Sequence, residues 1–155
     1  MTPSAAQFIP ADADYASRVR ASFDRQQAMH MLGAQLTVVE PGCVEIRLPY
    51  RVDLTQQHGF LHGGIVGMIL DSACGFAAFS LMPAHAGVLT VEYKINFVAP
   101  AKGEAIVAQG RVVKTGRTLT VCWGEAYAES EGQSKLVATM VGTMMTICGR
   151  EDVQS

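Results

Sequence analysis

The sequence is poor in charge and has no broad basic region. Charged side chains make up 17% of the 155 residues, and the formal net charge is −2. Such a chain offers no basic face that could neutralise a phosphate backbone, so we expect no nucleic-acid partner. Apolar residues make up 49% of the chain, which excludes intrinsic disorder. The expected class is therefore a globular protein.

Metal-binding and disulfide patterns are also lacking. The chain has four cysteines that are far apart and form no CxxC or Cys/His spacing: Cys43, Cys74, Cys122 and Cys148. We therefore expect neither a zinc site nor a secreted disulfide scaffold, and no cofactor of the protein's own. Residues 1–13 contain no basic side chain and no apolar core, so no signal peptide is expected. The expected compartment is the reducing cytoplasm.

No internal repeat or linker divides the chain, and its length suits a single domain over residues 1–155. The mean hydropathy of +0.20 is high for so small a domain. A small domain has much surface to cover, and such an apolar composition predicts that a partner subunit covers part of it.

The longest apolar stretch runs from residue 59 to residue 83. Its length raises the alternative of a membrane span, but it contains His62 and a central Asp71. A carboxylate at bilayer depth is costly and rare, so we expect a helix buried inside the protein and no membrane span.

The remaining chain predicts an N-terminal helix followed by strands on both sides of the apolar helix. A helical pattern lies within residues 11–32, and Pro41-Gly42 marks the turn of a hairpin. Four β-rich segments joined by turn signals follow the apolar helix: 88–98, 104–114, 117–129 and 135–147. These elements predict an α+β fold in which one curved antiparallel sheet wraps a long central helix.

The chemically distinctive residues lie between Gln56 and Asp71. Gly63 and Gly64 are adjacent at the expected start of the apolar helix, where a ligand can approach the backbone N–H groups. Such donors stabilise the negative charge that develops on a carbonyl oxygen. The alternative is that these glycines only allow the helix to pack closely on the sheet.

Asp71 lies in the middle of the apolar helix, where an ionised carboxylate needs a partner. A catalytic role is one explanation, and a structural pairing with backbone or with a basic side chain is the other. Eight residues separate Gly63 from Asp71, which corresponds to about 12 Å along a helix. If both groups act on one carbonyl, they must come from different subunits of a two-fold dimer.

Taken together, these motifs resemble the PaaI-like thioesterases of the hotdog superfamily. The resemblance covers about residues 33–147 and follows four motifs in order: His62-Gly63-Gly64 with Asp71, the run 89–100, the turn 114–117 and the strand 135–139. It implies a hotdog core over 33–147 preceded by a helical segment over 1–32. It also implies hydrolysis of acyl-CoA thioesters without a metal, in a homodimer or homotetramer.

The resemblance assigns roles to single residues. Asp71 matches the catalytic carboxylate, acting as general base or as nucleophile, and Gly63 matches the backbone donor to the thioester carbonyl. Gln56 matches an Asn or Gln that holds the water or the carbonyl. Thr90 matches a Ser or Thr beside the carboxylate. His62 supports the turn and approaches the thioester.

The remaining expected substrate contacts are Gly64 at the helix start and the turn residues Lys114 and Arg117, which are candidate partners for the phosphates of coenzyme A. Two rival site residues are less favoured. His58 has no nearby third ligand for a metal, and Cys74 is expected to be an inert thiol because its helix is apolar.

The few ionisable residues in the apolar segments favour a medium-chain, long-chain or aryl acyl group. Two alternative functions stay open at this stage. One is a non-catalytic module that binds or senses acyl-CoA, because a fold alone does not determine function. The other is a hotdog enoyl-CoA hydratase, although the Asp and His motif of those relatives is lacking.

Overall fold

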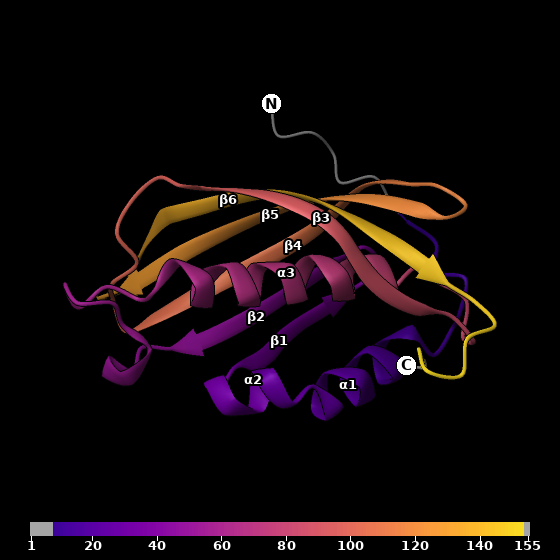
Figure 1. Cartoon of the computed structure of the whole chain (residues 1–155), viewed down its shortest axis with the longest axis horizontal. Coiled ribbons are helices and arrows are strands. Elements are labelled where there is room, and N and C mark those ends of the chain that lie inside the picture. The colour runs from indigo at the N-terminus through magenta and orange to yellow at the C-terminus, as the bar shows by residue number, and fades with distance from the viewer. Residues whose placement is uncertain (1–7, 154–155) are drawn as a thin grey trace.

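The computed structural model describes residues 8–153, which form one antiparallel sheet wrapped around a central helix (Figure 1). The elements in chain order are α1 (Tyr15–Arg25), α2 (Gln27–Leu32), β1 (Gln35–Glu40), β2 (Cys43–Pro49), the short 3-10 helix η1 (Val52–Leu54), α3 (Gly63–Phe79), β3 (Gly87–Phe97), β4 (Ala105–Thr115), β5 (Leu119–Ser130) and β6 (Gln133–Ile147). The predicted α+β fold is confirmed: two strands precede the central helix and four follow it.

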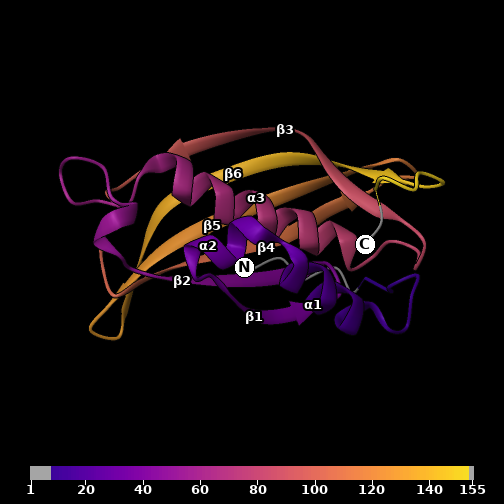
Figure 2. The same ribbon diagram turned by 60° about the horizontal axis from the view of Figure 1, so that its bottom comes forward.

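Strand β3 is separated in the sheet from its neighbour in sequence. The order of the six strands is β1-β2-β4-β5-β6-β3, so β3 pairs with β6 at one edge. Tight turns join β4 to β5 and β5 to β6, as expected, but residues 98–104 carry the chain from β3 across to β4 on the far side of β5 and β6. As a result, β3 lies alongside α3 and passes over the open flank of the helix (Figures 1 and 2).

The middle of α3 lies unusually close to the sheet because two strand residues there are glycines. A Cβ on Gly110 would stand 2.3 Å from the carbonyl carbon of Ala73, and a Cβ on Gly124 would stand 3.0 Å from the Cys74 sulfur. The side chains of α3 on this face are fully buried. Between residues 8 and 153 no helix is long and apolar enough to cross a membrane.

The N-terminal segment forms two short helices instead of one. Gln26 separates α1 from α2 with φ −78° and ψ 95°, and its N–H bonds to the Phe23 carbonyl. Gln26 is a good helix former, so local propensity does not explain the break. The cause is tertiary, because this segment bends to pack on β1 and α3 (Figure 2).

Arg18 of α1 holds the segment to the C-terminal end of α3. Its guanidinium donates to the Met82 carbonyl at 2.7 Å, pairs with Asp12 at 2.8 Å and stacks over the Phe79 ring at 4.2 Å. A cation at this position also complements the negative end of the helix dipole. The helical segment is therefore fixed against the same helix that carries Asp71.

The edge strand β3 exposes a series of large apolar side chains. Exposed fractions range from 44% to 54% for Leu89, Val91, Tyr93 and Phe97. An edge strand of 11 residues with unpaired backbone groups and apolar side chains is a template for pairing with another strand. Part of the apolar surface that the composition predicts is therefore exposed along this edge.

Candidate active site

Asp71 lies at the middle of α3 and points toward β3. The Thr90 hydroxyl donates a hydrogen bond to Asp71 Oδ1 at 2.7 Å, so these two residues lie side by side. Burial raises the pKa of the Asp71 carboxyl above its ordinary value, and the hydrogen bond from Thr90 acts against this rise. A half-buried carboxylate with a raised pKa and one oxygen left free is suited to accept a proton.

Asp71 and Thr90 line a small cavity of about 100 Å³ together with Gln26, Ser72, Gly75, Phe76 and Val88. Gly75 leaves open space one turn after Asp71, since a Cβ there would meet no described atom within 4 Å apart from its chain neighbours and the backbone of its own helix. The cavity has room for a few small groups beside the carboxylate, such as water molecules or the first atoms of a substrate.

The start of α3 leaves one backbone donor available. His62 is the N-cap, and its Nδ1 accepts a hydrogen bond from the Gly64 N–H at 2.9 Å. The N–H groups of Ile65 and Val66 bond to the His62 carbonyl. Within residues 8–153 the Gly63 N–H is left without a partner. Of the two adjacent glycines, Gly63 is therefore the one that can donate to a ligand, whereas the Gly64 N–H is already used.

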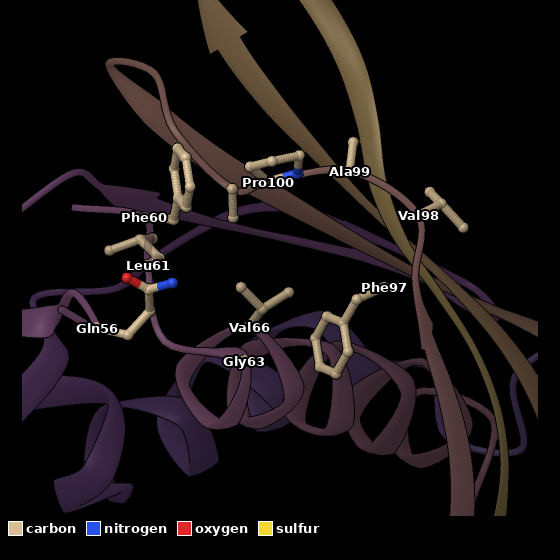
Figure 3. A pocket seen from close by; sticks show the side chains of 10 residues that line it. Gln56, Phe60, Leu61, Gly63, Val66, Phe97, Val98, Ala99 and Pro100 are labelled. Atoms are coloured by element: carbon tan, nitrogen blue, oxygen red, sulfur yellow. The ribbon is translucent and has the colours of Figure 1, made fainter. Parts of the chain in front are cut away.

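Gly63 opens onto a second, larger cavity. This cavity of about 510 Å³ is lined mainly by apolar side chains: Phe60, Leu61, Val66, Phe97, Val98 and Pro100, with Gln56 as the polar side chain (Figure 3). The carboxamide oxygen of Gln56 accepts a hydrogen bond from the His58 N–H, and its nitrogen is turned toward the cavity (Figure 3). Gln56 and Gly63 thus present two N–H donors to one apolar space.

The packing alternative for the helix-start glycines applies in part. A Cβ on Gly63 would come within 3.0 Å of the Phe97 ring, so a glycine here does allow β3 to approach the helix. A closer approach between α3 and the sheet, however, occurs at Gly110 of β4, where a Cβ would stand 2.3 Å from the Ala73 carbonyl carbon. Gly63 thus allows this packing and also lines the larger cavity.

A single chain does not bring Gly63 and Asp71 to one place. The cavity at Gly63 and the cavity at Asp71 share no lining residue. The two groups lie at the start and the middle of the same helix, which agrees with the separation of about 12 Å expected from helix geometry. One chain by itself therefore does not place the two groups on one carbonyl.

Lys114 and Arg117 lie at the other end of the molecule. Arg117 lines a groove with Ala78 and Met82, beyond the C-terminal end of α3, and Lys114 is exposed on β4. Neither cation pairs with an acidic side chain within residues 8–153. Their predicted contact with phosphate stays a prediction.

The structure adds Gln26 to the neighbourhood of Asp71, which sequence reasoning missed. No local signal points to it, because it comes from the N-terminal segment and reaches the cavity only through tertiary packing. Burial raises the pKa of the Cys74 thiol, in agreement with an inert role. No group of three His, Cys, Asp or Glu side chains in the described part of the chain could hold a metal, His58 included.

Comparisons with known proteins agree on one family. The family model of the Thioesterase superfamily matches residues 58–135. A thioesterase family protein from Silicibacter pomeroyi is 55% identical, with a TM-score of 0.86 over 87% of this chain and 99% of that chain. Human acyl-coenzyme A thioesterase 13 is 33% identical over 85 residues, which are 54% of this chain and 60% of that protein.

The fold has a solved counterpart in the PaaI protein of the E. coli phenylacetic acid degradation operon. Its TM-score is 0.80 at 19% identity, over 90% of this chain and 97% of that chain. The resemblance to PaaI-like hotdog thioesterases is confirmed at the level of family and fold. This chain belongs to the thioesterase superfamily and is a thioester hydrolase.

Proposed function

We propose that the protein hydrolyses acyl-CoA thioesters to a free acid and coenzyme A, with Asp71 as the general base. The observation that carries the proposal is the Asp71 carboxylate, held by Thr90 in a cavity and with its pKa raised by burial. Support for a coenzyme A thioester comes from the similarity to an acyl-coenzyme A thioesterase.

In the proposed reaction, Asp71 takes one proton from a water molecule, and the resulting hydroxide oxygen adds to the thioester carbonyl carbon. The Thr90 hydrogen is donated to Oδ1, so Oδ2 is the oxygen that accepts the proton. The C–S bond then breaks, and the proton held by Asp71 passes to the leaving sulfur. Water is consumed, and an acid and a free thiol are formed.

The oxyanion of the tetrahedral intermediate receives hydrogen bonds at the start of α3. The unpartnered Gly63 N–H is the main donor, and the Gln56 amide nitrogen faces the same cavity. His62 fixes this geometry by capping the next amide, that of Gly64. Preorganised donors of this kind stabilise negative charge without having to reorient during the reaction.

The complete site forms between two chains, because one chain separates Gly63 from Asp71. The exposed edge of β3 supports antiparallel pairing with β3 of a second copy across a two-fold axis. Thr90 contacts Asp71, and the Phe97 ring lies against Gly63. Antiparallel pairing that brings Thr90 of one copy beside Phe97 of the other would also bring one Asp71 beside the other Gly63. A homotetramer of two such dimers also satisfies this requirement.

The acyl group stays proposed as medium-chain, long-chain or aryl. The apolar lining of the larger cavity supports such groups. The chain needs no cofactor for the proposed chemistry. All four cysteines are free thiols, which supports a reducing, cytoplasmic setting.

Two experiments test the proposed substrate: an assay of thiol release, and substitution of the basic turn residues Lys114 and Arg117. Purified protein should release free thiol from acyl-CoA, and the double variant Lys114→Ala/Arg117→Ala should raise KM about tenfold if two phosphate contacts are lost. The same variant should hydrolyse an acyl-pantetheine, which lacks the nucleotide phosphates, as wild type does. Binding of acyl-CoA without any thiol release would contradict the proposed function. An unchanged KM in the double variant would show that this turn does not bind the phosphates.

Thr90 makes a separate prediction about pH. Activity requires ionised Asp71, so kcat/KM should rise with pH through the pKa of this carboxyl, which lies above the ordinary value for aspartate. Thr90→Val removes the hydrogen bond that lowers this pKa, so the acid limb of the pH profile should move to higher pH. Thr143→Val, which removes a hydroxyl bonded to Glu92 on the same β3–β6 ladder but outside the cavity of Asp71, should leave the profile in place. An unmoved acid limb in Thr90→Val would contradict the assignment of the base.

A further inference from the structure

The N-terminal segment contributes one polar side chain to the cavity of Asp71. Gln26 lies at the break between α1 and α2, outside the residues that match the family model, and lines the same cavity of about 100 Å³ as Asp71. The family match therefore says nothing about this residue. Its position depends on the packing of the helical segment on α3.

Hydrogen bonds orient the Gln26 carboxamide. The Ser72 hydroxyl, on the residue after Asp71, donates to Gln26 Oε1 at 3.3 Å. The carboxamide oxygen is thereby used, and the amide nitrogen has no partner within residues 8–153. Thr90 has likewise given its hydrogen to Asp71. The polar groups left for a ligand in this cavity are an N–H donor from Gln26 and an acceptor from Asp71.

The proposed reaction determines which part of the substrate meets this donor. Asp71 must act on a water at the thioester carbon, so that carbon lies at the mouth of the cavity. Coenzyme A is far too large for a space of about 100 Å³, which leaves the attacking water and the acyl atoms next to the carbonyl as occupants. The cavity is only a few atoms across, so an oxygen on the acyl chain near the thioester can reach Gln26.

We infer that Gln26 is a specificity-determining residue that binds an oxygen substituent, such as a 3-hydroxyl group, on the acyl part of the substrate. This inference rests on the proposed hydrolysis at Asp71. It narrows the substrate class from plain acyl thioesters to those with a hydrogen-bond acceptor close to the thioester. An unsubstituted acyl group would leave the Gln26 donor without a partner when the bound substrate fills the cavity.

The test compares kcat/KM for 3-hydroxyoctanoyl-CoA and octanoyl-CoA, which differ in one hydroxyl. Wild type should prefer the hydroxylated substrate, and Gln26→Leu, of similar size but without the donor, should lower that preference about fivefold, as the loss of one neutral hydrogen bond implies. Activity on octanoyl-CoA should not fall, because leucine removes a donor that this substrate leaves unpaired. Gln27→Leu, the exposed neighbour that does not line the cavity, should keep the wild-type ratio.

Ser72→Ala provides a second variant in case Gln26→Leu does not fold. Loss of the bond that orients the carboxamide should lower the preference in the same direction, by a smaller factor. Equal loss of activity on both substrates in Gln26→Leu, or a wild type without preference, would overturn the inference while leaving hydrolysis itself intact. Failure of the proposed function would look different, because Asp71→Asn would then hydrolyse both substrates as wild type does.

Discussion

Asp71→Asn should lower kcat for thiol release by about 10²- to 10⁴-fold, the usual contribution of a positioned general base. Asparagine keeps a carbonyl oxygen that can accept the Thr90 hydrogen bond, so the cavity should keep its shape. What is lost is the group that removes a proton from water. Asp53→Asn, which changes an exposed carboxylate paired with Arg51, is the matched control and should keep wild-type kcat.

The same substitution should not destabilise the fold at neutral pH. Burial raises the pKa of Asp71, so the folded chain favours the protonated form, and the ionised form costs stability once the pH exceeds that pKa. Asp71→Asn should therefore melt at a higher temperature than wild type at pH 7. The difference should shrink as the pH falls through the folded pKa. Wild-type turnover by a well-folded Asp71→Asn protein would show that Asp71 is not the base.

Gly63→Pro should lower kcat by about 10²- to 10³-fold, because proline removes the N–H that stabilises the oxyanion. The backbone tolerates this change. Proline is favoured at the first helical position, and His62 before it has φ −60° and ψ 136°, a conformation allowed before proline. The substitution therefore removes one hydrogen-bond donor and keeps the helix start.

Gly63→Ala is the matched control for this variant. Both substitutions add a Cβ that comes to 3.0 Å from the Phe97 ring, so this contact is the same in the two variants. Alanine, however, keeps the N–H. A large loss in Gly63→Pro with a small loss in Gly63→Ala identifies the donor, whereas equal losses would indicate that contact with Phe97 is what matters.

Local patterns predict the elements of this fold well, because its strands and its central helix have clear turn and hydropathy signals. Pro41-Gly42 marks the β1–β2 turn, and the apolar run from residue 59 contains α3. The position of β3 beside β6 could not be predicted in this way. Strand order depends on contacts between segments far apart in sequence, here about 50 residues apart along β3 and β6.

In the candidate site, too, local sequence predicts some features, whereas others depend on tertiary contacts. Gly63 and Asp71 lie within one helix, so helix geometry predicts their separation from their positions in the sequence. Gln26 reaches Asp71 from 45 residues earlier in the chain, across a helix break that its own propensity opposes. The Gly64 N–H looks as available as that of Gly63 in the sequence, and only the rotamer of His62 shows that it is already bonded.

The central claim is that each active site combines Asp71 of one chain with Gly63 of another. The direct measurement is thiol release by a hybrid dimer that pairs one Asp71→Asn chain with one Gly63→Pro chain, purified through a different tag on each. One of its two sites then contains intact Asp71 and intact Gly63, so the hybrid should recover about half of the wild-type kcat per dimer, although each parent dimer is inactive. A hybrid dimer as inactive as its parents would show that both groups act within one chain, and would contradict the account.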